Sequence, residues 1–428
     1  MTRSKPIVLA AALGLLLASW GPPGAAVAAA AGGMPQPQRI VNVSDTEGLR
    51  NALRQARMGT HIRLRPGEYR GGLYFAGVRG TQRHPIVVMA ADPTRPPVIR
   101  GGSNGIQFSS PAHLILQDLV FEGATTNGLN IDDGGTMDFS AHDIVMRRLQ
   151  VRNVGDRGNQ DGIKLSGVTR FRIEQCTIEH WGEGGSAIDM VGCSHGVIEG
   201  STFRHREGLT SGNGVQAKGG SEHIIVRHCN FYHAGERNVQ IGGLTGLRFF
   251  RPQPPQGAEA RHITVEGCIL VGARAAVAFV SAEDSTFRHN TIYRPQRWVI
   301  RILQEQRAEG IVPCRNNTLS HNLIVYRQEE IGQVINVGPG TQPGTFNFSH
   351  NFWYCEDRPR SVPPLPAREQ NGTYGRDPLF NPPVPGDFSV ADDSPARHVG
   401  AHSLTEPTRL PGEEGDDGEQ DDDEQEAA

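Results

Sequence analysis

The stretch "NGVQAKGGSEHIIVRHCNFYHAGERNVQIGG", residues 213–243, decides the fold. Apolar and polar residues alternate from Val215 to Lys218 and again from Val239 to Gly242, and a glycine turn follows each run. A period of two is typical of β-strands whose two faces differ. The two runs begin 24 residues apart, so this part of the chain repeats a short unit of strands and turns.

The same unit recurs along most of the sequence. Its first strands begin at Ile106, Leu129, Ile163, Ile188, Val215, Val239, Val277, Ile300 and Ile335. The shorter intervals are 23 to 27 residues, too few for a propeller blade, which needs roughly 40 residues. A leucine-rich repeat would need a regular Leu/Asn frame, which the units lack. The spacing therefore predicts an all-β, right-handed parallel β-helix of about ten rungs, with equal positions stacked about 4.8 Å apart.

A helix is predicted at the start of this solenoid, over residues 44–59, "SDTEGLRNALRQARMG". Ser44 and Glu47 have capping-box spacing. The apolar stripe consists of Leu49, Ala52, Leu53 and Ala56. Such a helix would cover the open edge of the first rung, so residues 40–400 are expected to form one capped domain.

The two ends of the chain differ from this domain. Residues 1–31 combine Arg3 and Lys5, an apolar run and small residues, which predicts a cleaved signal peptide and a secreted or periplasmic protein. A membrane anchor is the alternative, but the run is short for a span of about 20 residues, and no other transmembrane segment is expected. Residues 411–428 form an acidic tail that is expected to be disordered.

Charge and cysteine content narrow the function classes. Formal net charge is −4, and ten of the acidic residues lie in the tail, so the folded part is mildly basic. That balance suits an acidic ligand without suggesting nucleic acid, and a monomer is expected. The cysteines lack metal-ligand spacing. Cys229 and Cys268 fall on neighbouring rungs and could bond, but a stack of buried thiols is the favoured interpretation.

Polar and charged residues collect on the outward face of the first predicted sheet. They are Asn130, Asp132, Asp161, Lys164, Asp189, Gln216, Lys218, Arg237 and Gln240. The charged members extend over five rungs, roughly 20 Å, long enough for several sugar units. An insertion after Gly242, "GLTGLRFFRPQPPQG", adds Arg248 and Arg251 beside two phenylalanines. Cations and aromatic rings beside a polar groove suit an acidic polysaccharide, although a solenoid surface is polar in any case.

The repeat units, together with residues 44–75 and "HPIVVMAADPTRPPVIRGGS" (84–103), resemble the pectin-lyase-like superfamily over residues 40–390. These segments are most similar to polysaccharide lyases of the alginate lyase and chondroitinase B type. The resemblance implies binding and β-elimination of a uronate-containing polysaccharide, with Lys218 in the place of the catalytic base. A lysine acts as a base only when its pKa falls from near 10.4 to about 7–8, for example beside other cations.

The resemblance also suggests roles for the remaining face residues. Arg237 and Gln240 would lie near the developing charge, because Gly242 stands where the family has an arginine. The residues expected to contact sugar are Lys164, Asp189, Gln216, Asn130, Arg248 and Arg251. Members of this family often bind calcium, and Asp132 and Asp161 are the candidate ligands for Ca²⁺ here, since Ser211 and Asn213 occupy the usual places.

Two other functions remain open at this stage. One is a non-catalytic β-helix that binds glycans at a surface. The other is a polygalacturonase-like hydrolase, which needs paired aspartates. The motifs "NQDG" (159–162) and "IDD" (131–133) echo that enzyme class, but their order differs and its later elements are missing.

Overall fold

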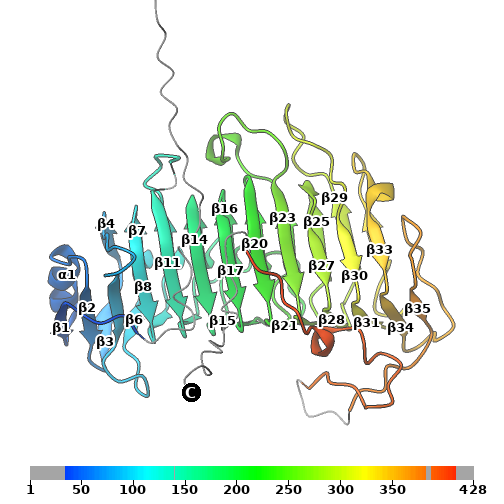
Figure 1. Ribbon diagram of the computed structural model, residues 1–428, viewed down its shortest axis with the longest axis horizontal. Helices are drawn as coiled ribbons and strands as arrows, with labels where there is room; N and C mark the ends of the chain where they lie inside the picture. The colour runs from blue at the N-terminus through cyan, green and yellow to red at the C-terminus, as the bar shows by residue number, and fades with distance from the viewer. Residues whose placement is uncertain (1–33, 139, 382–386, 411–428) are drawn as a thin grey trace, which may run out of the picture.

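The computed structural model describes residues 34–138, 140–381 and 387–410, so the predicted signal peptide and acidic tail lie outside the described residues. The chain winds into a parallel β-helix with three long sheets, A, B and C (Figure 1). A typical turn contributes one strand to each sheet, as β19 (Asn213–Lys218, sheet C), β20 (Ser221–Arg227, sheet A) and β21 (Asn230–Tyr232, sheet B) do. The prediction of an all-β solenoid is confirmed.

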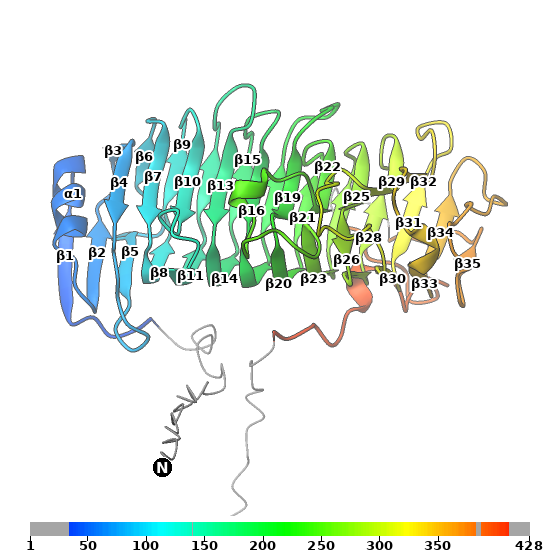
Figure 2. The same ribbon diagram turned by 90° about the horizontal axis from the view of Figure 1, so that it is seen from above.

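Sheet C carries the polar face and has ten strands in one unbroken order (Figure 2). Besides β19, they are β4 (Leu73–Ala76), β7 (Asn104–Ser109), β10 (Asn127–Asp132), β13 (Asp161–Ser166), β16 (Ser186–Val191), β22 (Arg237–Gly242), β25 (Ala275–Val280), β29 (Trp298–Leu303) and β32 (Ile335–Val337).

Sheets A and B complete the rungs. The other strands of sheet A are β1 (Arg39–Val43), β2 (Thr60–Leu64), β5 (Ile86–Ala90), β8 (Ala112–Gln117), β11 (Ala141–Arg147), β14 (Val168–Glu174), β17 (Ser194–Glu199), β23 (Ala260–Glu266), β26 (Ala282–Glu283), β27 (Thr286–Arg288), β30 (Thr318–Ser320) and β33 (Asn347–Ser349). The other strands of sheet B are β3 (Glu68–Arg70), β6 (Val98–Arg100), β9 (Val120–Glu122), β12 (Gln150–Arg152), β15 (Thr177–Glu179), β18 (Thr202–Arg204), β24 (Ile269–Val271), β28 (Thr291–Tyr293), β31 (Leu323–Tyr326), β34 (Phe352–Cys355) and β35 (Thr373–Tyr374).

The register of sheet C matches the predicted repeat. All nine predicted starting residues, from Ile106 to Ile335, pair with one another from strand to strand and are buried. Leu73 of β4 pairs with Ile106 and adds a rung that the repeat analysis missed. The ladder of inward side chains fills the core, and side chains at the intervening positions point outward.

The predicted helix covers the first rung. Helix α1 (Thr46–Arg54) lies at the end of the solenoid beside β1 and β2, with Leu49, Ala52 and Leu53 buried (Figure 1). The N-cap is one residue later than the predicted Ser44, so the expected capping box is wrong. Asp45 is the N-cap, and its carboxylate accepts the backbone N–H of Gly48 at 2.7 Å. Asp and Ser are equally good caps, so composition could not choose between the two residues.

The turns between sheets A and B carry stacked polar residues. Asn290, Asn322 and Asn351 are fully buried. The backbone N–H of Asn290 donates to Asn322 Oδ1, and that of Asn322 donates to Asn351 Oδ1, both at 3.0 Å. Cysteines occupy equivalent places on earlier rungs. All six cysteines are free and buried, as the buried-thiol interpretation expected. The remaining helical elements are the short turns η1 (Leu247–Phe249), η2 (Pro343–Thr345) and η3 (Ala401–Ser403).

A column of histidines stands next to the asparagine ladder. The rings of His289, His321 and His350 stack 4.6–4.8 Å apart. Each of these residues has φ between 50° and 56°, the left-handed conformation that the tight turn requires. Burial, followed by the charge of His321, lowers the pKa of His289 from 6.5 to about 4. The folded state therefore binds fewer protons than the unfolded chain between these two values.

This histidine column should make the fold sensitive to acid. As pH falls from about 6.5 to about 4, we expect His289 to remove roughly 1–2 kcal/mol of the free energy of unfolding, allowing for solvent screening of a half-exposed ring. The variant His289→Asn keeps a residue that tolerates positive φ and should flatten this pH dependence in urea titrations. The exposed His398→Asn serves as control, and equal slopes in both variants would contradict the assignment.

Candidate functional site

The middle row of outward side chains on sheet C runs straight along the solenoid. Register places Gln107, Asn130, Lys164, Asp189, Gln216 and Gln240 on successive strands. Neighbouring members are about 4.8 Å apart. We call the outward surface of β7 to β29 the sheet C face. The predicted superposition of residues about two dozen positions apart is therefore present.

Two lysines converge on one buried carboxylate at the centre of this face. The Lys164 ammonium contacts Asp189 Oδ2, and Lys218 Nζ lies 3.3 Å from Asp189 Oδ1. Lys218 Nζ also donates to Gln216 Oε1 at 3.2 Å. The side chain of Asp189 is 1% exposed, whereas those of Lys164 and Lys218 are 20% and 17% exposed. Asp189 thus holds together two lysines whose side chains are partly exposed, which we call the lysine pair.

A second carboxylate, that of Asp161, lies beside Lys164. Asp161 Oδ2 is 3.6 Å from Lys164 Nζ, and Asp161 Oδ1 accepts the backbone N–H of Ser186 at 2.8 Å. Burial and the nearby charge of Asp189 raise the pKa of Asp161. Burial also acts to raise the pKa of Asp189, but Lys164 and Lys218 outweigh it and lower that pKa. The site therefore contains an ionised Asp189 beside a carboxyl group that protonates more readily.

The use of lysine at this site is unusual for this chain. Lys5, Lys164 and Lys218 are the only lysines in the sequence, and all its other Lys or Arg side chains are arginines. Arginine serves in the ion pairs elsewhere, for example with Glu174 or Glu266. Lysine differs from arginine in being able to lose its proton in a protein. This signal was present in the composition and could have marked the pair from sequence.

The predicted cationic neighbour of Lys218 is not where we expected it. In the sheet register, Arg237 of β22 lies beside Asn213, the first residue of β19. Lys218 is the last residue of β19, so the two side chains start five residues, or about 16 Å, apart along the strand direction. The Arg237 guanidinium donates to Gln240 Oε1 and lies 3.4 Å from Glu305. The close charged neighbour of Lys218 is the Asp189 carboxylate, whose Oδ1 lies 3.3 Å from Lys218 Nζ.

Two glutamines of the row are held at the end of β22, where the insertion begins. The backbone oxygen of Gly242 accepts the side-chain N–H groups of Gln216 and Gln240 at 3.3 and 3.2 Å. These two side chains are buried, as is Asp189. Gln216 and Asp189 contact the lysine pair, whereas Gln240 contacts Arg237. This corrects the expected sugar contacts of Gln216 and Asp189. Asn130 is half-buried on the row, and its sugar contact stays a prediction.

The two arginines of this insertion have different environments. Arg248 is exposed and stacks over the ring of Phe249, 4.6 Å from its centroid. Arg251 is buried, and its Nη2 and Nε donate to Asp133 Oδ2 at 2.7 and 3.0 Å. The expected sugar contact of Arg251 is therefore wrong, because its guanidinium is used to fasten the insertion to the loop after β10.

The two predicted calcium ligands do not form one site. Asp132 pairs with Ser166, so it lies five residues, or about 16 Å, along the strand direction from Asp161. Calcium binds its oxygen ligands at about 2.3–2.6 Å. Asp132 instead accepts hydrogen bonds from Gln107 and Ser109. The residues present do not fit a shared calcium ion.

Another carboxylate group lies beside histidines on sheet A. Ligand atoms of His113, His142 and Asp143 lie within 4.8 Å of one another. The Arg170 guanidinium donates to both oxygens of Asp143 at 2.9 and 2.8 Å, and a second guanidinium, from Arg79, contacts His142. Two cations next to the group oppose a metal ion, so this cluster is a structural ion-pair network.

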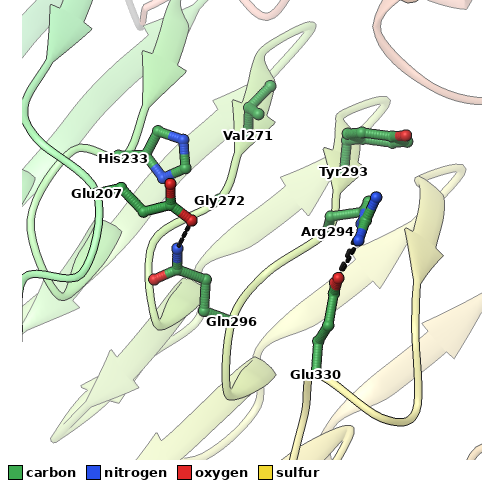
Figure 3. Close-up of a pocket in the computed structure, with 8 residues that line it drawn as sticks. All are labelled: Glu207, His233, Val271, Gly272, Tyr293, Arg294, Gln296 and Glu330. Carbon is green, nitrogen blue, oxygen red and sulfur yellow. Dashed lines mark hydrogen bonds and ion pairs between the residues drawn. The ribbon is translucent and has the colours of Figure 1, made fainter.

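A cavity of about 510 Å³ opens at the corner where sheet B turns into sheet C (Figure 3). Figure 3 shows two polar pairs on its wall, Glu207 with Gln296 and Arg294 with Glu330. Tyr293 and His233 also line it. It contains none of the residues predicted from sequence. No helix in the described part of the chain is long and apolar enough to cross a membrane.

Comparison with known proteins identifies the architecture. The family model described as "Right handed beta helix region" matches residues 137–351, half of the chain. No curated protein shows a significant sequence match. A lacto-N-biosidase from Eubacterium ramulus is structurally similar, with 11% identity, coverage of 78% of this chain and 68% of that chain, and a TM-score of 0.52.

Two lyases are also similar in structure. The alginate lyase from Paenibacillus sp. str. FPU-7 has 16% identity, covers 72% of this chain and 99% of its own, and gives a TM-score of 0.43. A mannuronic acid specific family 6 lyase from human gut microbiota has 16% identity, coverage of 77% and 91%, and a TM-score of 0.45. At these identities the likeness concerns the fold alone.

Proposed function

The chain belongs to the right-handed β-helix family, and we propose that it binds an acidic, uronate-containing polysaccharide along the sheet C face. The observation that carries this proposal is the lysine pair. The only two lysines of the β-helix meet at one buried aspartate, and the side chains of both are partly exposed. Ammonium groups form strong, charge-assisted hydrogen bonds with carboxylates, and each uronate unit of the polymer carries one carboxylate.

Asp189 holds the two lysine side chains in place before the ligand binds. Lys164 and Lys218 stand on strands two rungs apart, and their like charges would repel without the carboxylate between them. Holding two long side chains in place beforehand reduces the entropy lost on binding. Asn130 is next to Lys164 in the row, and Arg248 is exposed on the insertion, so both are placed to make further sugar contacts in this proposal.

Eliminative cleavage at the same face is a second candidate function, favoured by the choice of lysine over arginine. In this reaction Lys218 would remove the proton next to the uronate carboxylate, and Lys164 would neutralise that carboxylate. The bond between the ring carbon and the leaving sugar oxygen breaks as the double bond forms, and that oxygen takes a proton from solvent. Because Lys218 Nζ contacts the Asp189 carboxylate, the base role requires that this contact be broken in the complex so that the amine can reach the sugar proton. Binding has no such requirement.

A single panel of polymers separates these functions. The protein is incubated with alginate, pectate or a glycosaminoglycan, and with neutral mannan as control. Elimination produces an unsaturated uronate that absorbs in the ultraviolet. Hydrolysis, the third candidate, produces reducing ends without that absorbance. A binding protein retains the acidic polymer on a column and releases neither product.

The scarcity of lysine offers a direct test of the site. Reductive methylation of the protein after removal of residues 1–31 should modify Lys164, Lys218 and the amino terminus alone. A bound acidic polymer should slow methylation of both lysines, measured by mass spectrometry of peptides, and neutral mannan should not. Equal rates with and without every acidic polymer would contradict binding at the lysine pair. Export through residues 1–31 and a monomeric state remain parts of the proposal.

A further inference from the structure

Three arginines surround one tryptophan farther along the sheet C face, and a fourth arginine lies two strands away. The guanidinium carbons of Arg301, Arg297 and Arg274 lie 4.2, 4.4 and 5.6 Å from the ring centroid of Trp298. Register aligns Trp298 with Ala275 and then with Arg237, two strands away. We call these five residues the Trp298 cluster.

Positive charge in the cluster is only partly compensated. Glu236 is shared by three arginines, with Arg301 Nη1 at 3.5 Å and the Nε atoms of Arg237 and Arg274 at 3.9 Å. Glu305 lies 3.4 Å from Arg237. Four guanidinium groups against these two carboxylates leave a formal charge of +2. The distances exceed the roughly 2.7–2.9 Å of a strong charge-assisted hydrogen bond.

The cluster also has unused hydrogen-bond donors. The Nε atoms of Arg237 and Arg274 are buried and have no hydrogen-bond partner among the described residues. An unpaired buried donor costs free energy that an acceptor would recover. Burial and the neighbouring charge of Arg237 lower the pKa of Arg301, as expected where cations crowd together. Oxygen atoms of an anion would supply both the acceptors and the compensating charge.

The position of the cluster indicates which anion would reach it. Arg301 stands in the same outward row as Lys164, Asp189 and Gln240. Three strand steps, about 14 Å, separate the rung of Lys218 from the rung of Arg301. Between the lysine pair and Arg301 this row consists of Gln216, Gln240 and Ala278, all of them buried, and Arg237 lies against Gln240. A polymer that lies above this covered stretch and parallel to the row would extend from the lysine pair to the cluster.

We propose that the Trp298 cluster is a second anion subsite for the same polysaccharide, where it binds a carboxylate or sulfate group several sugars away from the lysine pair. This inference rests on the proposed function, because it assigns the two sites to one polymer. It implies that the ligand carries anionic groups at intervals along its chain, and that a short oligosaccharide cannot occupy both sites.

Affinity measured against ligand length tests this inference. Calorimetry compares a uronate hexasaccharide with the corresponding disaccharide for wild type, Arg301→Gln and Arg297→Gln. We expect the arginine variants to weaken hexasaccharide binding about tenfold and to change disaccharide binding less than about twofold. Arg297 is exposed, so its replacement should leave the fold intact. A sulfated glycosaminoglycan hexasaccharide, measured in parallel, shows whether carboxylate or sulfate is preferred.

Controls separate this inference from the proposed function. Arg204→Gln removes an arginine that also stacks over an aromatic ring, that of Tyr232, but on sheet B, and should bind like wild type. If Lys218→Gln weakens hexasaccharide binding and both cluster variants bind normally, the second subsite is wrong and the proposed function stands. If only the cluster variants lose affinity, the cluster binds anions and the lysine pair does not.

A probe without sugar tests the cluster alone. Titration with inorganic sulfate should change the tryptophan fluorescence of the wild type, and the change should be absent from Trp298→Phe. A sulfate response that persists unchanged in Trp298→Phe, or that is lacking in the wild type, would overturn the assignment of an anion subsite at Trp298. Far-ultraviolet circular dichroism confirms that each variant is folded.

Discussion

Replacement of Lys218 by arginine should keep polysaccharide binding within about threefold of wild type and lower eliminative turnover by about 10²–10⁴-fold. Arginine retains the positive charge that Asp189 and a uronate carboxylate both require. It cannot lose its proton in a protein and therefore cannot act as a base. Binding is measured by calorimetry with the best polymer of the panel, and turnover by ultraviolet absorbance.

Two further variants make this result specific. Lys218→Gln removes the charge as well and should weaken binding about tenfold in addition to abolishing turnover. Lys164→Arg makes the same chemical change on the other lysine, whose proposed role needs only charge, and should retain turnover. If Lys218→Arg turns over at the wild-type rate, Lys218 is not the base. If the wild type shows no turnover, the arginine and glutamine variants still test whether the pair binds through charge.

Residue spacing was sufficient to predict the fold and the row of the site. The starting residues from Ile106 to Ile335 differ in spacing, but every unit must return its apolar residues to the same inward ladder. A one-residue slip would turn the whole apolar set outward, so the alternation fixes the register. That is why Lys164, Asp189 and Gln216 could be placed on neighbouring rungs from sequence.

Side-chain partners were harder to predict than rungs. Register specifies which backbone positions adjoin, but a lysine or arginine side chain reaches several ångströms in any direction. Lys218 therefore pairs with Asp189, one rung back and two residues along the strand, and not with the expected Arg237. The Trp298 cluster was missed for a related reason, because Arg274 and Arg297 belong to turns outside the counted strand positions.

The insertions show the firmest limit of sequence reasoning. Arg251 and Asp133 are 118 positions apart, in loops with no period that could relate them. Composition suggested an exposed cation beside aromatic residues, and Arg248 does have that environment. Nothing in the spacing distinguishes Arg248 from Arg251, because the difference arises from how the irregular loop folds back on the sheet C face.

The buried pair of Arg251 and Asp133 is expected to have the largest effect of any ion pair on stability. The two side chains are 4% and 1% exposed. Arg251→Met should lower the free energy of unfolding by about 3–5 kcal/mol, because the Asp133 carboxylate would remain buried without its cation. The measurement is urea unfolding followed by circular dichroism. Limited proteolysis should also cut within residues 244–256 faster than in the wild type.

The expected loss of stability is large because the Arg251–Asp133 pair is buried, and a salt bridge alone would not produce it. Arg261 and Glu222 also form an ion pair at 2.7 Å, but their side chains are 45% and 28% exposed. Arg261→Met should therefore cost less than about 1 kcal/mol. Adding Asp133→Asn to Arg251→Met removes the stranded charge and should restore part of the lost stability, so the two substitutions are non-additive. Equal losses for Arg251→Met and Arg261→Met would show that the insertion is not fastened through this pair.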